Sequence, residues 1–305
     1  MAELKKVLAA SDGSEHGLNA IVTAASWARR AGARFEAVTV VEVLLLPPAH
    51  APPGVDATEF EPALVTEARE SLEGQVRQAG APQAPLHVRA GLAPQLVNRV
   101  ADEVKADLLV VGADPQPALT RSLVGSTGRR ILYLADRPVL LASEPRREPF
   151  RRVLAAVDLS EKSGAVLEGA WAIARGDGAA LRVLYVLEPL PLMLARKALY
   201  EESERRRHGE DQMRQVLAAA GLQKERTVDE RMRQGHAGRE ILQEAQDWDA
   251  DLIAVGTHGF GFFDRLLFGS TALYVLRHGQ RSTLVVPGQP VPPDTMKRRG
   301  RPWTT

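Results

Sequence analysis

Glycine and hydroxyl residues are concentrated in one segment of the second half of the chain, in a pattern suited to phosphate. Gly256 and Gly259 are separated by two residues, and nine further residues precede Gly269-Ser270-Thr271. Glycines let a backbone approach a ligand closely and adopt positive φ. The residues after Thr271 are typical of a helix. Free N–H groups at a helix start favour an anion, and the hydroxyls add donors. This segment therefore predicts a site for a phosphate-bearing ligand.

A carboxylate in the same half could complete such a site. Asp158 directly follows the apolar run 153–157. Its oxygens could accept hydrogen bonds from ribose hydroxyls, or help to hold a metal ion bound to phosphates. A helix cap is the alternative role for Asp158, Ser160 and Ser270, and single glycines at strand ends usually form turns. At one edge of a sheet, these residues together favour a ligand site over isolated caps and turns.

The chain repeats itself, which indicates the elements that must position these residues. Residues 6–15 (KVLAASDGSE) recur as RVLAAVDLSE at 152–161, and residues 106–112 (ADLLVVG) recur as ADLIAVG at 250–256. Such self-similarity is the signature of repeated structural units. The polar, proline-bounded stretch 143–149 is typical of a linker between the two copies.

Each half alternates short apolar runs with amphipathic stretches of helical length. This alternation indicates βαβ units, a parallel sheet and helices on both faces. We predict an α/β fold of two tandem Rossmann-like, doubly wound domains, each with a five-stranded parallel sheet in the order 3-2-1-4-5. Ligands bind such sheets where the connections reverse direction, which places Asp158 and Gly256 at one crevice. The predicted limits are 1–144 and 150–288 for the domains and 289–305 for a basic C-terminal tail.

The second half resembles the ATP-binding members of the universal stress protein family. The glycine segment matches the family's nucleotide motif, which is glycine, two residues, glycine, nine residues, glycine, then Ser or Thr. The first apolar run with Asp158, and the apolar runs around the motif, also look like that family. The resemblance covers most of both repeats, Glu3–Ala142 and Arg151–Pro287.

The resemblance implies a role for each residue of the site. Asp158 would face the ribose and any metal, Val186 would pack beside the adenine, and Ala156 is compatible with the same adenine pocket. His258, inside the motif loop, is expected in the pocket wall. The ribose–phosphate path would be lined by Val255, Gly256 and Gly259, and the phosphates would be held by Gly269, Ser270 and Thr271. The implied ligand is ATP, either alone or with Mg²⁺.

The first repeat departs from the motif. Its segment reads Gly112-Ala-Asp114-Pro115, so the second motif glycine is replaced by a residue with a fixed φ and no N–H. Asp114 adds negative charge where phosphates would approach, although Asp12 and Gly125-Ser-Thr are retained. We expect weak or no nucleotide binding there, and a mainly architectural role for this repeat.

Composition limits the partners of the protein. The 305 residues carry a formal net charge of +1 and contain no cysteine. The small charge gives no strong field toward nucleic acid, and the lack of cysteine excludes disulfides and thiolate metal sites. The longest apolar runs are of strand length, so we expect no membrane span. We therefore expect a cytoplasmic protein that does not bind nucleic acid.

The function implied by the resemblance is stress tolerance, with ATP occupancy of the second repeat acting as a sensor or switch. The sequence contains no Gly-x-Ser-x-Gly, His-Glu-x-x-His or P-loop pattern. Without an evident general base, ATP hydrolysis is expected to be slow at most. We expect the repeats to pack on each other and the chain to form a homodimer. Two alternatives stay open: a nucleotide-free interaction scaffold with unknown protein partners, and a binder of another adenosine-containing or small anionic ligand.

Overall fold

The computed structural model describes five stretches of the chain, in which each repeat alternates five strands with four helices. The described residues are 3–42, 57–113, 126–189, 198–257 and 269–288. The first repeat comprises β1 (Lys6–Ser11), α1 (Glu15–Ala31), β2 (Arg34–Val41), α2 (Ala57–Gln78), β3 (Leu86–Ala90), α3 (Ala93–Glu103), β4 (Leu108–Gly112), α4 (Ser126–Leu134) and β5 (Val139–Ala142). The second comprises β6 (Arg152–Val157), α5 (Ser163–Asp177), β7 (Ala180–Leu187), α6 (Ala198–Ala219), β8 (Val228–Gln234), α7 (Ala237–Asp247), β9 (Leu252–Gly256), α8 (Ser270–His278) and β10 (Ser282–Val286).

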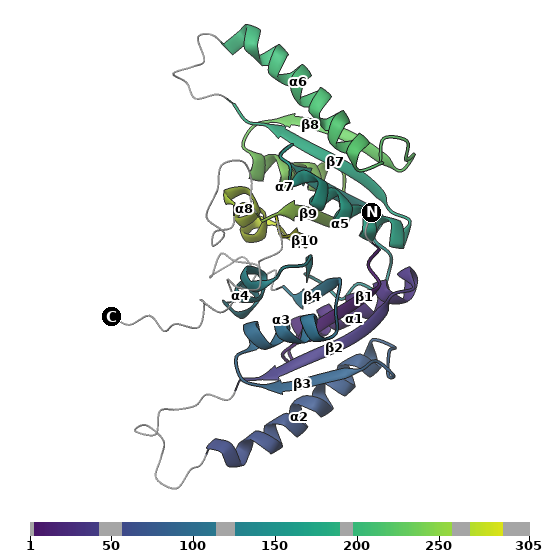
Figure 1. The fold of residues 1–305 in the computed structure, drawn as a ribbon, viewed down its shortest axis with the longest axis vertical. Coiled ribbons are helices and arrows are strands. Elements are labelled where there is room, and N and C mark those ends of the chain that lie inside the picture. Colours follow the sequence, from purple (N-terminus) through teal and green to yellow (C-terminus); the bar gives the residue numbers. More distant parts are fainter. Residues whose placement is uncertain (1–2, 43–56, 114–125, 190–197, 258–268, 289–305) are drawn as a thin grey trace, which may run out of the picture.

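The strands of both repeats form a single sheet. Its order in the described residues is β3-β2-β1-β4-β5-β10-β9-β6-β7-β8. Figure 1 shows β3 toward one end of the molecule and β8 toward the other. Each half keeps the order 3-2-1-4-5 with parallel neighbours, which confirms the predicted fold class. The halves meet where β5 and β10 pair antiparallel, with Leu284 opposite Leu140.

Local sequence sets the ends of the first helix of each repeat. The Ser14 side chain accepts a hydrogen bond from the Gly17 N–H and caps α1. Gly32 ends α1 with a φ of 70°, and Gly178 ends α5 with a φ of 68°. This left-handed conformation is easily adopted by glycine, so the repeated glycines fix where each helix turns back to the next strand.

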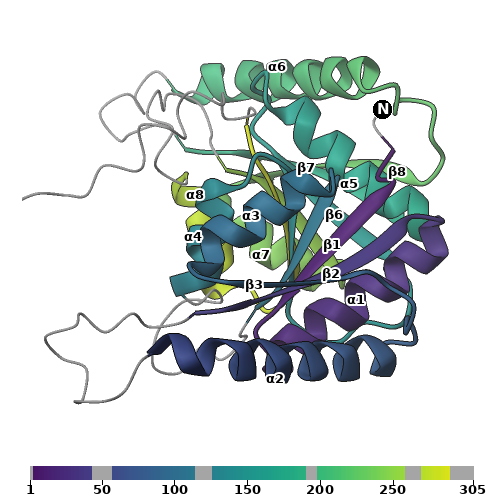
Figure 2. The same ribbon diagram turned by 60° about the horizontal axis from the view of Figure 1, so that its bottom comes forward.

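Two hydrophobic cores cover the two faces of the sheet. One core packs α1, α2, α5 and α6 against the strands, and the other packs α3, α4, α7 and α8. Figure 2 shows the strands of the first repeat between α3 and α4 on one side and α1 and α2 on the other. Both cores contain residues of both repeats, such as Trp27 and Ile173, so neither core stops at the junction.

Central and edge strands differ in composition because their surroundings differ. The first four residues of β4 and of β9 are fully apolar and buried, as expected for strands covered on both faces. The edge strand β8 has the sequence VDERMRQ and is largely exposed. Charged residues on an edge strand oppose pairing with a further strand.

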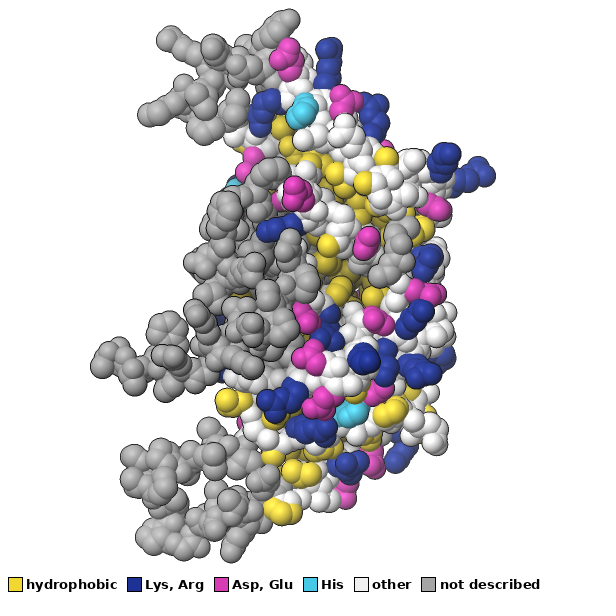
Figure 3. Space-filling model, viewed as in Figure 1, with side chains coloured by type: hydrophobic (Ala, Val, Ile, Leu, Met, Phe, Trp, Pro, Cys, Tyr) yellow, Lys and Arg dark blue, Asp and Glu magenta, His cyan; other side chains and the backbone are white. Residues whose placement is uncertain are grey.

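Charged side chains of both signs are mixed on the described surface. On the face shown in Figure 3, dark blue and magenta side chains lie next to one another over both repeats. This mixing agrees with the formal net charge of +1. Among the described residues, no helix combines the length and apolar composition that a membrane span requires.

Candidate functional site

A cavity opens in the second repeat where the sheet connections reverse direction. β6 pairs with β7 along its whole length but with β9 only from Val153 to Ala155. The two strands therefore separate beyond Ala155, as expected for the crevice of a doubly wound sheet. The cavity has a volume of about 370 Å³. Its lining includes Ala156, Asp158, Lys162, Ser163, Tyr185, Val186, Arg205, Ile241, Val255, Gly256, Gly269, Ser270 and Thr271.

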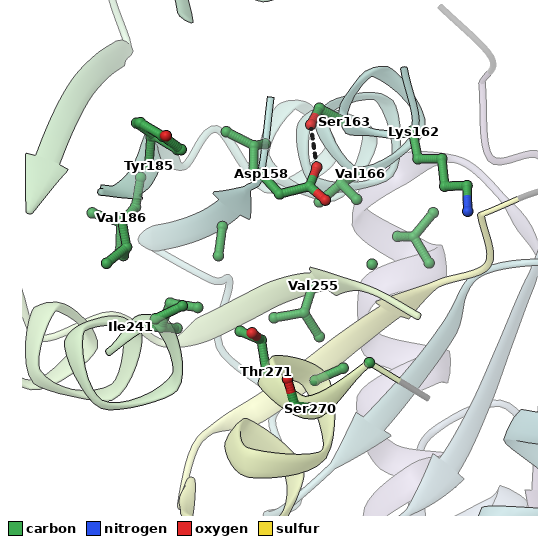
Figure 4. Close-up of a pocket in the computed structure, with 18 of the residues that line it drawn as sticks. Asp158, Lys162, Ser163, Val166, Tyr185, Val186, Ile241, Val255, Ser270 and Thr271 are labelled. Atoms are coloured by element: carbon green, nitrogen blue, oxygen red, sulfur yellow. Dashed lines mark hydrogen bonds between the residues drawn. The ribbon is translucent and has the colours of Figure 1, made fainter. Parts of the chain in front are cut away.

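Asp158 is held by a tight turn at the end of β6. Its Oδ1 accepts hydrogen bonds from the Ser160 N–H at 3.0 Å, the Ser160 hydroxyl at 2.6 Å and the Ser163 hydroxyl at 3.0 Å. Leu159, between them, has a φ of 60°. This left-handed conformation is costly for a residue with a side chain. The turn fixes the orientation of the carboxylate, as the Asp158–Ser163 bond in Figure 4 shows.

The second oxygen of Asp158 is buried and has no hydrogen-bond partner. A buried polar atom without a partner costs free energy, and in native structures it calls for an explanation. Because Asp158 lines the cavity, a ligand hydroxyl or a metal ion is one such explanation. No group of three or more His, Cys, Asp or Glu residues in the described part of the chain is placed to hold a metal ion. A metal here would thus depend on oxygens of the ligand, a common arrangement for Mg²⁺.

One end of the cavity is apolar. Ala156, Val186, Ile241 and Val255 line it, and Figure 4 shows Val186 and Ile241 on the side of the cavity away from Lys162. Val255 is 3% exposed and Val186 is 9% exposed, so both are held in the core. An apolar slot beside a carboxylate suits a planar ring that carries a polar group, because most ligand sites combine apolar walls with a few oriented polar groups.

Another part of the cavity is formed by the start of α8. Gly269 is the cap residue and has no side chain to satisfy the first amides of the helix. The first N–H groups of a helix lack partners within it, and the helix dipole favours an anion there. The hydroxyl residues Ser270 and Thr271 line the cavity at the same place. This end of the site can therefore bind a phosphate group.

Two further polar side chains come from strand β7 and from α6, a helix on the opposite face of the sheet from α8. Burial raises the pKa of Tyr185 above its usual value, so its hydroxyl stays protonated and can donate a hydrogen bond. Arg205 donates to the backbone oxygen of Glu188 at 2.9 Å. Both residues line the cavity and close it on the side of α6.

The structure brings together every predicted site residue that it describes. Asp158 does not cap α5, whose cap residue is Lys162, and Ser270 does not cap α8, whose cap residue is Gly269. His258 and Gly259 lie outside the described residues. Sequence reasoning missed other lining residues, among them Lys162, Ser163, Tyr185, Arg205 and Ile241. The first two follow Asp158 by four and five positions and could have been found as part of its turn.

The first repeat keeps the turn but changes the residues around it. Asp12 Oδ1 accepts a hydrogen bond from the Ser14 N–H at 3.0 Å, as its counterpart does in the second repeat. The position of Ser163 is taken by Gly17, and a Cβ there would clash with the Ser11 hydroxyl. Asp12 therefore lacks the third donor. Asp114 and Pro115 lie outside the described residues.

The cavity described in the first repeat lies at a different place. It has a volume of about 280 Å³ and is lined by residues of β1, β2 and α2 but by none of β4 or α4. The crevice between the first and fourth strands is the part of the fold that binds ligands in doubly wound sheets. In the second repeat, by contrast, the described cavity lies in this crevice.

The strand order and the crevice define a doubly wound α/β protein built from two similar units. The sequence model of the universal stress protein family matches residues 3–143 and 149–287. The chain therefore belongs to the universal stress protein family and contains two of its domains in tandem.

Known relatives agree with this assignment. A universal stress protein of Thermus aquaticus is 32% identical over 138 residues, which is 45% of this chain and 98% of that protein. One from Mycobacterium bovis is 27% identical over 199 residues, 62% of this chain and 67% of that protein. The crystal structure of a universal stress protein from Archaeoglobus fulgidus superposes with a TM-score of 0.67 at 18% identity, covering 94% of this chain and all of the other. That structure supports the fold.

Proposed function

We propose that the second repeat binds an adenine nucleotide, first of all ATP, and that its occupancy acts as a sensor or switch in the stress response. The observation that carries the proposal is the combination of groups that line one cavity. Apolar side chains such as Val186 and Val255, the open oxygen of Asp158 and the start of α8 border the same space. A base, a ribose and a phosphate present the complementary chemistry.

The size of the cavity is consistent with this proposal. Its volume of about 370 Å³ falls within the range of about 300–1,000 Å³ found for small-molecule sites. Asp158 would be the protein group that holds a Mg²⁺ ion, and the ion would offset the negative charge of the phosphates. The assignment is one of binding, and hydrolysis is expected to be slow at most.

Assembly and location form the wider part of the proposal. Pairing of β5 with β10 already joins the two repeats within one chain. We propose that the first repeat serves as the architectural partner of the second, that two chains form a homodimer, and that the protein acts in the cytoplasm. The exposed, charged residues of β8 argue against a dimer formed by extending the sheet at that edge.

The first test is to denature purified native protein and identify any released nucleotide by chromatography and mass spectrometry. We expect an adenine nucleotide in a ratio of about one per chain. No released nucleotide, together with no thermal shift on adding ATP and Mg²⁺, would favour the interaction scaffold. Release of another anionic compound would support the second alternative.

A matched pair of variants assigns the nucleotide to one repeat. Asp158→Asn keeps the oxygen that accepts from Ser160 but replaces the open carboxylate oxygen with an amide. Hydrogen bonds to charged groups contribute about 1.5–3 kcal/mol, so we expect affinity for ATP to fall about tenfold or more. Asp12→Asn makes the same change in the first repeat and should leave the affinity unchanged. Equal losses in both variants, measured by calorimetric titration, would contradict a single site.

A further inference from the structure

Lys162 places an ammonium group beside the proposed phosphate end of the cavity. The residue lies at the start of α5, is half-buried and lines the cavity. Its side chain lies against Gly288, where an added Cβ would come within 2.9 Å of Lys162 Cδ and 3.6 Å of Nζ. Figure 4 shows Lys162 on one side of the cavity and Ser270 on the other. The lysine and the start of α8 thus border the same space from two directions.

The charge of Lys162 is not neutralised within the described structure. Nζ forms neither an ion pair within 4.0 Å nor a hydrogen bond with any described residue. The nearby carboxylate of Asp158 directs Oδ1 to Ser160 and Ser163 instead. Nζ is also not one of the buried unpartnered atoms in the described part of the chain, so it stays accessible to a ligand. An anionic ligand group can therefore pair with it.

The lysine is a feature of the second repeat. The position four residues after the strand-end aspartate is Lys162 in the second repeat and His16 in the first. The other cation at the cavity, Arg205, comes from α6 and already donates to the Glu188 backbone oxygen. Among the described cations that line the cavity, Lys162 differs from Arg205 in that its charged group has no hydrogen-bond or ion-pair partner in the described residues.

We propose that Lys162 determines specificity by contacting the phosphate chain, so that the site selects ATP and ADP over AMP and adenosine. This inference rests on the proposed nucleotide function and adds a preference within it. A single phosphate at the start of α8 satisfies the helix amides. Further phosphates add negative charge beside the lysine, and their binding strengthens because ammonium–phosphate hydrogen bonds are charge-assisted.

The test measures binding of ATP, ADP, AMP and adenosine to the full chain by calorimetric titration, with and without Mg²⁺. We expect Lys162→Gln to lower the affinity for ATP and for ADP about tenfold. Its affinity for adenosine should change by less than about twofold. Lys162→Arg should keep most of the preference, because it keeps the charge. Lys224→Gln, an exposed lysine outside the cavity, should match the wild type.

The outcomes separate this inference from the proposed function. Wild-type protein that binds neither ATP nor adenosine would overturn both. Wild-type protein that binds ATP, with Lys162→Gln binding it equally well, would overturn the role of Lys162 alone. Equal weakening of ATP and adenosine in Lys162→Gln would show a structural role and would likewise overturn the proposed specificity.

Discussion

The two strand-end aspartates show how the same local turn can serve different sites. Gly13, with a φ of 84°, and Leu159, with a φ of 60°, give both repeats the same left-handed residue after the aspartate. A leucine in this conformation costs about 1–2 kcal/mol. The turn is the same although the second repeat has a leucine where the first has a glycine. What distinguishes the second repeat is the next turn, where Lys162 and Ser163 add a charge and a hydroxyl to the cavity.

Glu36 makes the stability of the first repeat depend on pH. Its Oε2 lies 2.7 Å from His87 Nε2, and its Oε1 lies 3.1 Å from Lys6 Nζ. Burial raises the pKa of Glu36, but the hydrogen bonds from His87 and Lys6 outweigh it and hold the pKa below the usual value. The ionised carboxylate therefore stabilises the fold above the unfolded pKa of about 4.3. This contribution is lost as the pH falls through the lower, folded pKa.

We expect Glu36→Gln to lower the free energy of unfolding by about 1 kcal/mol near neutral pH. The difference from the wild type should shrink as the pH falls below about 4, because the wild-type carboxyl is then protonated. Urea unfolding at several pH values measures this difference in the free energy of unfolding. Glu70→Gln, at an exposed position of α2, is the control and should show no such trend. A difference that stays constant with pH would contradict the assignment.

Residue patterns predicted only part of the candidate site. The glycine and hydroxyl spacing led to Gly256, Gly269 and Ser270 because helix starts and strand ends have strong local signatures. Tyr185 and Ile241 have no such signature. They reach the cavity through the packing of β7 and α7, and only the assembled sheet brings those elements together.

Elements were predictable where burial is complete and less so at the edges. The buried strands β4, β5 and β9 consist mainly of short apolar runs. The apolar part of β2 begins at Ala37, whereas the strand itself begins at Arg34 and its described part ends at Val41. Its charged first residues pair with β1, with Arg34 opposite Lys6. Backbone pairing there does not require apolar side chains, so the apolar pattern missed the start of the strand.

Helix α7 packs closely on α8, the helix whose start lines the cavity. A Cβ on Gly238 would lie 2.6 Å from Tyr274 Cδ1 and 2.8 Å from Tyr274 Cβ. Tyr274 also stacks on His278 at 4.2 Å between ring centroids. The contact includes the base of the tyrosine side chain, so α8 must shift to accept a methyl group.

We expect Gly238→Ala to lower the free energy of unfolding by about 1–3 kcal/mol and to weaken ATP binding through the displaced start of α8. Gly74→Ala is the matched control, because nothing lies within 4 Å of its added Cβ in α2. That change should stabilise the protein by about 0.5–1 kcal/mol. Chemical unfolding distinguishes the two. A stabilising Gly238→Ala would contradict the close packing.

At the scale of the whole molecule, the repeats share one sheet and two cores. Repeat–repeat packing was predictable from the internal duplication. The pairing of β5 with β10 was not, because VLLA and STLVV carry no information about which edge each will meet. The exact domain limits, 1–144 and 150–288, stay predictions, since the junction is continuous with both cores.

Asp177 holds this junction together from within. Its side chain is fully buried, and it accepts hydrogen bonds from Arg30 Nε at 2.6 Å, Arg30 Nη2 at 3.1 Å and the Phe150 N–H at 2.7 Å. The carboxylate at the end of α5 is therefore bonded both to α1 of the first repeat and to the residue that directly follows the linker. A buried ion pair need not add net stability, but removing one partner leaves the other charge uncompensated.

We expect Asp177→Ala to lower the free energy of unfolding by about 3–5 kcal/mol. Because the repeats share their cores, the wild type should unfold in one transition, and the variant should unfold earlier or in two steps. Asp211→Ala is the control: Asp211 is 62% exposed and pairs with Arg214 at 2.5 Å, and such surface pairs contribute about 0–1 kcal/mol. Guanidinium unfolding followed by circular dichroism measures both. If the two variants lose equal stability, Asp177 is not the link between the repeats, and the shared sheet alone must couple them.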